Sequence, residues 1–307
     1  MLKNIFLYRV KNSLPISISD TEEALYENRF VECGASQEQS FGWVAPRGGA
    51  HDALLECVDN EMILRLMVES KSVPAAVIKR KTDERIEKLE QETGRKPGKK
   101  ERKEIAEDAK LSLLPMAFAK RSASIVWISL ADGLLAIEAS SQSRADEVVT
   151  ALVHAIDGIK IEVINTAMSP SSAMSNWLTT QEAPADFTVD RECELKAADE
   201  SKAVVKYARH ALDIEEVRQH VTDGKLPTKL AMTWDDRVSF VLTEGLQIKK
   251  IELLDVVMTD SLDRADDDAH SFDTDVAIFT GEMRKLIPSL LDALGGEMIV
   301  GAAEAAE

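Results

Sequence analysis

The chain has 307 residues, of which 45% are hydrophobic and 30% charged, enough to bury a substantial core and to form two or three compact units. Its formal net charge of -17 argues against a protein uniformly coated with basic residues for nucleic acid. No apolar run approaches the roughly 20 residues that span a bilayer, and no apolar block of a signal peptide opens the chain, so we expect a cytoplasmic protein with no membrane partner.

The first half of the sequence predicts strands and helices with one unusual insertion. Strands are predicted over residues 4–10 and 62–68, and a helix over residues 21–28. Beyond these, residues 75–91 and 99–114 are rich in Lys, Glu, Arg and Ala, and a Gly- and Pro-containing segment separates them. This pattern predicts an antiparallel pair of helices, whose narrow apolar stripe favours projection from the body.

The second half continues as a mixture of strands and helices. Asp132-Gly133, flanked by two apolar runs, is typical of a β-hairpin turn, and a helix over 143–156 and a strand over 160–165 are predicted to follow. Residues 169–175, rich in Ser, Pro and Ala, are predicted to be a linker to a second unit. That unit is predicted to hold a mainly antiparallel sheet and two helices, with strands at 193–196, 202–207, 228–233, 238–243 and 248–254 and helices at 214–223 and 274–294.

The sequence carries no motif of the common enzyme classes. It has no P-loop, no GxGxxG after a strand, no GxSxG elbow and no HExxH, and its five histidines lack the spacing of metal ligands. A metal-dependent nuclease that uses Asp263, Asp266 and Asp267 stays open as an alternative, although a solvated acidic loop explains these residues more simply. We expect no cofactor, no metal, and reduced, buried thiols at the three cysteines.

Positive charge is concentrated in one segment. Residues 79–121 hold 14 Lys and Arg against 9 Asp and Glu, a surplus of 5, so the rest of the chain carries -22. Such cations can neutralise phosphates of any sequence, whereas neither a base-reading helix nor an aromatic platform for single strands is evident. The candidates on and near the helical pair are Lys79, Arg80, Lys81, Arg85, Lys88, Arg95, Lys96, Lys99, Lys100, Arg102, Lys103, Lys120 and Arg121. Phe118, beside the last two, is a candidate hydrophobic anchor between two such hairpins.

Short blocks along nearly the whole chain, in order, resemble the RdgC family. The blocks are Lys3-Asn4 with Tyr8-Arg9, Gly42-Trp43-Val44 with Pro46, His51-Asp52-Ala53-Leu54, Leu113-Leu114-Pro115 with Ala117-Phe118, Trp127-Ile128, Thr228-Lys229-Leu230-Ala231 with Trp234 and Arg237, Phe272-Asp273 with Asp275, Gly281-Glu282, and Leu294-Gly295-Gly296-Glu297. The sequence departs at Leu2, where an aromatic is common, and at Met116, where relatives often carry an arginine that could contact phosphate.

The resemblance implies an α+β, horseshoe-like subunit with antiparallel sheets and an inserted helical hairpin. Residues 1–75 and 122–175 would form its centre, 76–121 the tip and 176–307 the base, and two subunits would close tip to tip and base to base into a ring dimer around duplex DNA. The implied role is sequence-independent binding of duplex DNA, with single-stranded DNA as a further candidate. Such a nucleoid-associated protein would restrain RecA-promoted recombination without catalysing a reaction.

The resemblance also implies particular contacts. A second set of DNA contacts would come from Lys206, Arg209, His210 and Lys229, and the dimer interface at the tip would involve Leu114, Pro115 and Phe118. One alternative remains open besides the nuclease. In it the protein is a scaffold whose hairpin binds a partner helix, and its charge serves only solubility.

Overall fold

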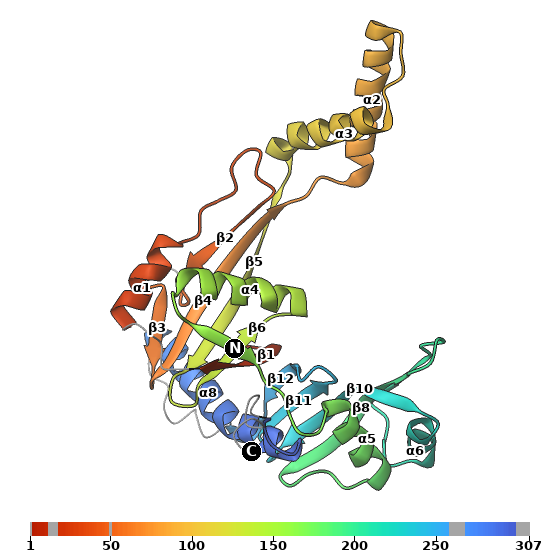
Figure 1. Cartoon of the computed structure of the whole chain (residues 1–307). Helices are drawn as coiled ribbons and strands as arrows, with labels where there is room; N and C mark the ends of the chain where they lie inside the picture. The colour runs from red at the N-terminus through yellow and green to blue at the C-terminus, as the bar shows by residue number, and fades with distance from the viewer. Residues whose placement is uncertain (1, 12–17, 49–50, 258–267, 299–307) are drawn as a thin grey trace, which may run out of the picture. The chain divides into compact units, whose positions relative to one another are not determined.

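The structure of this protein, a computed structural model, describes residues 2–11, 18–48, 51–257 and 268–298. It has two compact units, shown with their elements in Figure 1. Unit 1 comprises Met1–Ile18, Leu55–Ile63 and Ile125–Glu307, and unit 2 comprises Ser19–Leu54 and Leu64–Ser124. Both contain helices and antiparallel strands, which confirms the α+β class.

Unit 1 contains a long antiparallel sheet. In sheet order its strands are the second half of β5 (Ala119–Ser129), β6 (Leu134–Glu138), β1 (Ile5–Lys11), β12 (Ile248–Leu253), β11 (Val238–Thr243), β10 (Lys225–Trp234), β8 (Phe187–Ala197) and β9 (Val204–Ala208), with β7 (Lys160–Val163) paired to β1 and β3 (Leu55–Val58) paired to β4 (Glu61–Lys71). The predicted β5–β6 hairpin is confirmed, and Gly133 at its turn has a φ of 58°.

Helices cover the sheet of unit 1 and complete its core. They are α4 (Gln142–Ala155), α5 (Pro170–Thr180), α6 (Glu215–Thr222) and α8 (Asp268–Ala293). Phe279 of α8 meets Trp127 of β5 edge to face, with ring centroids 6.3 Å apart. α8 also contains Pro288, which has no N–H to donate to the carbonyl of Arg284 four residues earlier.

A buried carboxylate, that of Glu61, links several elements of unit 1. Its side chain is 2% exposed and accepts hydrogen bonds from the indole N–H of Trp127 at 2.6 Å and the hydroxyl of Ser129 at 3.2 Å. Arg284 of α8 lies 3.3 Å from the same carboxylate and also pairs with Asp132, which lowers the pKa of Asp132. The start of β4, the β5–β6 turn and α8 therefore share one polar network.

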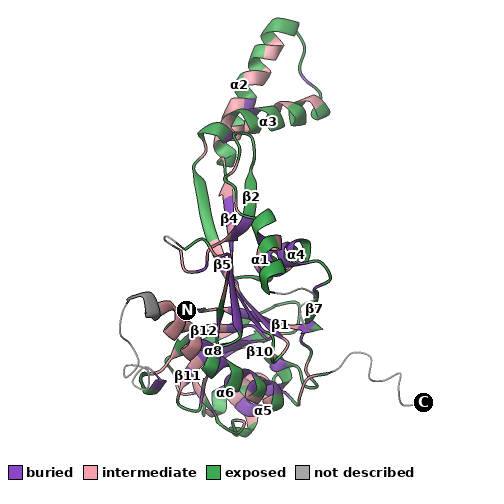
Figure 2. Ribbon diagram, turned by 90° about the vertical axis from the view of Figure 1, so that its left-hand side faces the viewer, coloured by how far each residue is buried: buried purple, intermediate pink, exposed green. Residues whose placement is uncertain are grey.

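Unit 2 contains three paired strands and the inserted helices. Its strands are β2 (Gln39–Val44), most of β4 and the first half of β5, and its helices are α1 (Ile18–Glu27), α2 (Ala75–Thr93), α3 (Lys99–Leu113) and the short 3-10 turn η1 (Leu114–Met116). The predicted helical insertion between β4 and β5 is confirmed. Figure 2 shows that α2 and α3 are largely exposed, whereas burial is concentrated in the strands.

The structure corrects several expectations about local structure. Residues 169–175 are not a linker, because Ser169 caps the N-terminus of α5 through its hydroxyl and Pro170 occupies the first helical turn, where a missing N–H does no harm. β2 and β3 were not predicted. Figures 1 and 2 show α3 lying across α2 rather than antiparallel beside it, and Thr82 and Ala109 are the residues of these two helices that are buried.

The cysteines and tryptophans differ in how well they were predicted. All four tryptophans lie in the core, as expected for apolar surroundings. All three cysteines are free, but only Cys193 is buried, whereas Cys33 is half-buried and Cys57 is exposed. The expectation of three buried thiols was therefore wrong, because Cys57 lies on the outward side of the short strand β3.

We predict that Gly42→Ala destabilises unit 2. A Cβ atom at Gly42 would lie 2.5 Å from the Cα and N atoms of Phe30, which are backbone atoms and cannot rotate away. We expect the free energy of unfolding to fall by about 1–3 kcal/mol, as measured by urea denaturation followed by circular dichroism.

Gly281→Ala in α8 is the matched control, because nothing lies within 4 Å of its added Cβ. Alanine favours a helix by up to about 1 kcal/mol relative to glycine, so this variant should be neutral or more stable. Equal stability of the two variants would contradict the packing of β2 on Phe30.

Candidate nucleic-acid interface

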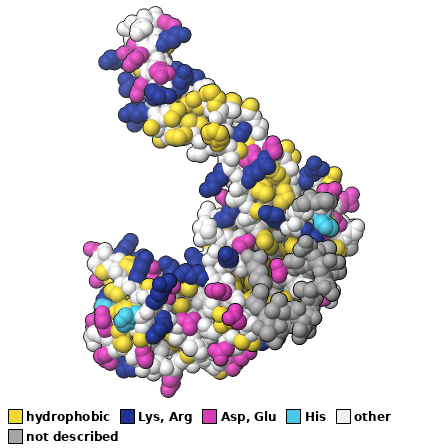
Figure 3. All heavy atoms as spheres, turned by 180° about the vertical axis from the view of Figure 1, so that it is seen from behind, with side chains coloured by type: hydrophobic (Ala, Val, Ile, Leu, Met, Phe, Trp, Pro, Cys, Tyr) yellow, Lys and Arg dark blue, Asp and Glu magenta, His cyan; other side chains and the backbone are white. Residues whose placement is uncertain are grey.

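The outer end of the helical hairpin carries four exposed lysines without carboxylate partners. Lys96 lies in the connection between α2 and α3, and Lys99, Lys100 and Lys103 follow in the first turns of α3. Positions 99, 100 and 103 share one helix face because of their three- and four-residue spacing. None of the four forms an ion pair with another residue in the described part of the chain, and Figure 3 shows Lys and Arg side chains gathered on this hairpin.

Two arginines of the same region are held by local contacts. Arg95 donates two hydrogen bonds to Glu101, at 2.8 and 2.9 Å, which raise the pKa of Arg95 and lower that of Glu101. Arg102 donates to the carbonyl of Pro97 at 3.2 Å, a contact that leaves its charge uncompensated. The two arginines therefore shape the connection between the helices, and of the pair only Arg102 keeps its charge free for a phosphate.

Cations of α2 mostly pair along their own helix. Arg80 and Lys81 share Glu84, at 3.9 and 3.4 Å, and Lys88 lies 3.9 Å from Glu92. These pairs are exposed, and such pairs contribute only about 0–1 kcal/mol. A phosphate could therefore replace these carboxylates at little cost.

The remaining basic candidates of unit 2 near the hairpin differ in whether their side chains contact other residues. Lys79 and Lys120 are exposed and form no ion pair with a described residue. Arg85 donates to the hydroxyl of Ser112 at 2.9 Å and so connects α2 with α3.

Arg121 has a structural role in unit 2. It donates to Glu69 at 2.6 Å and also to Glu32, and its guanidinium lies 5.6 Å from the ring centroid of Phe30. The hydrogen bond from Arg121, followed by one from the backbone N–H of Cys33, lowers the pKa of Glu69. A phosphate would have to take Arg121 from two carboxylates, so its role as a DNA contact stays a prediction.

In unit 1, two of the predicted contacts share one carboxylate. Lys206 of β9 and Lys229 of β10 each lie 3.0 Å from Glu194 Oε2 of β8, and Thr228 donates to Glu194 Oε1 at 2.8 Å. Burial alone raises the pKa of Glu194, but the hydrogen bonds from Lys206, Thr228 and Lys229 outweigh it and lower the pKa to about 2.

Arg209 and His210 follow β9 and are both exposed. Arg209 has a φ of 56°, which turns the chain away from the strand, and the backbone N–H of His210 donates to the carbonyl of Arg191 at 3.0 Å. The ring of His210 lies 5.7 Å from that of Tyr207 and its Nδ1 donates to the carbonyl of Ala211 at 2.8 Å. Their role in binding stays a prediction.

An apolar surface lies beside the hairpin cations. Phe118 is 95% exposed, and Met116 and Leu111 are 71% and 46% exposed. Pro115 is also exposed, whereas Leu114 is fully buried and so lies beneath this surface. Sequence reasoning identified Phe118 but treated Met116 only as a lost phosphate contact and missed Leu111, although both are apolar residues within a charged segment.

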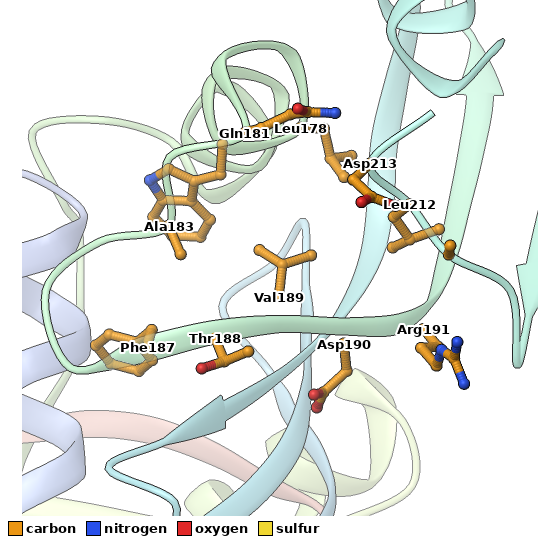
Figure 4. Close-up of a pocket in the computed structure, with 12 residues that line it drawn as sticks. Leu178, Gln181, Ala183, Phe187, Thr188, Val189, Asp190, Arg191, Leu212 and Asp213 are labelled. Atoms are coloured by element: carbon orange, nitrogen blue, oxygen red, sulfur yellow. The ribbon is translucent and has the colours of Figure 1, made fainter. Parts of the chain in front are cut away.

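No catalytic constellation is evident among the described residues. A cavity of about 590 Å³ lies in unit 1, where Val189 points into it and Thr188 and Asp190 point away (Figure 4). Within the described ranges, no group of three or more His, Cys, Asp or Glu side chains could hold a metal ion. Asp263, Asp266 and Asp267 of the nuclease hypothesis lie outside the described residues. Among the helices of the described ranges, none has the length and apolarity of a membrane span.

Comparison with known proteins gives matches over almost the whole chain. The family model described as "RdgC: Putative exonuclease, RdgC" matches residues 1–297. The recombination-associated protein RdgC of Dechloromonas aromatica is 40% identical over 300 residues, which cover 97% of this chain and 98% of the relative. The proteins of the same name from Herminiimonas arsenicoxydans and Cupriavidus pinatubonensis are 39% and 40% identical over 295 residues, 96% of this chain and 98% of each relative.

Proposed function

Because the chain belongs to the RdgC family of recombination-associated proteins, we propose that it binds DNA without sequence preference and restrains RecA-promoted strand exchange, without catalysing a reaction. The observation that carries this proposal is the group of exposed lysines at the end of the α2–α3 hairpin, which pair with no carboxylate among the described residues, in a chain whose net charge is -17. In a cell this activity would place the protein on the nucleoid.

The charge distribution supports backbone contacts rather than base readout. Lys96, Lys99, Lys100 and Lys103 carry flexible point charges that suit phosphates in any sequence. The acidic remainder of the chain repels DNA at long range, so the positive segment dominates the long-range attraction. The four tryptophans offer no stacking platform for unpaired bases, because all four are buried.

We further propose that the protein acts as a homodimer that closes into a ring around duplex DNA. Each horseshoe-like subunit would contribute a tip at residues 76–121, a centre at 1–75 and 122–175, and a base at 176–307. The apolar surface of Phe118 and Met116 supports a contact at the tip, because a 95% exposed phenylalanine gains most from burial against a partner. Occupied duplex would then be less accessible to a RecA filament.

We predict that reversing four charges at the hairpin end abolishes most of the DNA binding. Replacing Lys96, Lys99, Lys100 and Lys103 together by Glu should lower the affinity for unrelated linear duplexes at least about a hundredfold near physiological salt. The loss of four phosphate contacts should also flatten the slope of log K against log salt by about 3.6. Fluorescence anisotropy across a salt series measures both quantities.

Replacing the same four lysines by Arg is the control, because it keeps the charge and should retain binding. Unchanged affinity of the charge-reversed variant would show that the hairpin end is not a DNA contact. A wild-type protein indifferent to every duplex would favour the scaffold alternative instead.

We predict that Phe118→Ser weakens the dimer. Loss of a central aromatic anchor of an interface typically removes about 2 kcal/mol or more, so the dissociation constant of the dimer should rise about 30-fold. Analytical ultracentrifugation across a concentration series measures it. Phe41→Ser is the control, because Phe41 is also exposed in unit 2, at 57%, but lies in β2. Equal effects of the two substitutions would contradict a contact at Phe118.

The description of the family as an exonuclease keeps one enzymatic alternative under test. We expect linear duplex and single strands to stay intact during prolonged incubation with the protein and Mg²⁺ or Mn²⁺. End-labelled DNA on a denaturing gel provides the measurement. If the labelled DNA becomes shorter, and a variant with Asp263→Asn, Asp266→Asn and Asp267→Asn no longer shortens it, the protein is a nuclease. That result would overturn the proposal of a purely binding protein.

A further inference from the structure

Three side chains form a row across one face of the sheet of unit 1. Glu194 of β8 is the register partner of both Lys206 on β9 and Lys229 on β10. Strand side chains alternate between faces, and the neighbouring Cys193 and Leu230 are buried in the hydrophobic core on the other face. The row therefore lies on the face opposite that core.

The two lysines are accessible, whereas the carboxylate between them is not. The side chains of Lys206 and Lys229 are 68% and 40% exposed, and that of Glu194 is 17% exposed. Both ammonium groups contact the same oxygen, Glu194 Oε2, and the Thr228 hydroxyl donates to the other oxygen. Three donors from three strand positions thus converge on one anion.

A third donor distinguishes this row from the other carboxylates that two cations share. Two cations also meet at Glu84 and at Glu282, but at Glu194 a threonine hydroxyl donates to the carboxylate as well. Lys206, Glu194 and Lys229 together carry one positive charge in excess. Converging ammonium and hydroxyl donors are also what a phosphate oxygen requires.

We propose that Lys206, Lys229 and Thr228 form a phosphodiester-binding site that Glu194 keeps closed, with its carboxylate in the place of a phosphate oxygen until bound DNA displaces it. This inference rests on the proposed DNA binding and deepens it. Glu194 holds the two lysines at neutral pH as well, because a carboxyl group with a pKa of about 2 stays ionised there.

Displacement of a built-in carboxylate changes how the site responds to salt. A free lysine that neutralises a phosphate releases a counterion, whereas a lysine taken from Glu194 leaves a carboxylate that recruits a cation from solution. The exchange therefore adds little to the salt dependence of binding. The hairpin lysines, which have no carboxylate partner among the described residues, dominate the salt dependence of binding. The row on the sheet adds its full share to this dependence only when position 194 carries no charge, as in Glu194→Gln.

Glu194→Gln tests the site directly. Glutamine keeps the shape and can still accept from Thr228, but it no longer neutralises the lysines. We expect linear duplex to bind about three- to tenfold more tightly at constant salt, and the slope of log K against log salt to steepen by about 0.9, the value for one added phosphate contact. Adding Lys206→Gln and Lys229→Gln in the same protein should remove the gain.

Glu215→Gln is the matched control. It removes the same charge and releases Arg218, its partner at 3.3 Å, but it lies on α6, which packs on the core face of the sheet. We expect less than a twofold change in its affinity. Thr228→Val added to the Glu194→Gln protein is a second variant. It removes one of the proposed phosphate donors without changing any charge, so it should lose part of the gain in affinity.

The outcomes separate this site from the general function. If wild-type protein binds DNA but Glu194→Gln leaves affinity and salt slope unchanged, the site is overturned and the proposed function stands. An equal gain in Glu215→Gln also overturns the site, because the effect then follows net charge. Failure of the wild-type protein to bind any duplex overturns the proposed function, and the site with it.

Discussion

The buried charge of Glu61 is the constraint on which the packing of unit 1 depends. An ionised carboxylate is stable in a protein interior only if hydrogen bonds and an opposite charge replace its water. Trp127, Ser129 and Arg284 supply these partners from β5 and α8, so the strands and the helix can pack only in the arrangement that brings them together. Arg284 in turn pairs with Asp132 at the β5–β6 turn, so a single deep charge fixes the position of a surface turn.

Much of the fold could be predicted from the sequence because its signals are local. The β5–β6 hairpin follows from Asp132-Gly133 in adjacent positions, and α2 and α3 follow from helical composition interrupted by Gly and Pro. α5 was missed because Ser-Pro has two local meanings, a linker or a helix start, and burial of the following residues decides between them. Sheet order could not be predicted, since the pairing of β1 with β12 joins residues that are distant in sequence.

The candidate site shows the same division between local and distant information. The exposed lysines of the hairpin were found because their segment is rich in charge. The carboxylates that hold Arg121 and Lys229 were not found, because they lie 52 and 89 residues away from the first and 35 residues away from the second. A count of basic residues therefore overstates the positive charge that a ligand meets. Only contacts in the folded chain distinguish a cation that stabilises the protein from one that is free to bind.

Pro288 has a consequence for how the end of the C-terminal helix is held. The carbonyl of Arg284 has no N–H donor four residues later, so the hydrogen-bond ladder of α8 is interrupted at the residue that contacts Glu61 and Asp132. Beyond this break Leu290, Leu291 and Leu294 are buried in the core, and the carbonyl of Leu294 accepts a hydrogen bond from the backbone N–H of Met168 at 2.9 Å. The last turns of α8 therefore depend on contacts with the rest of unit 1 as well as on the ladder of their own helix.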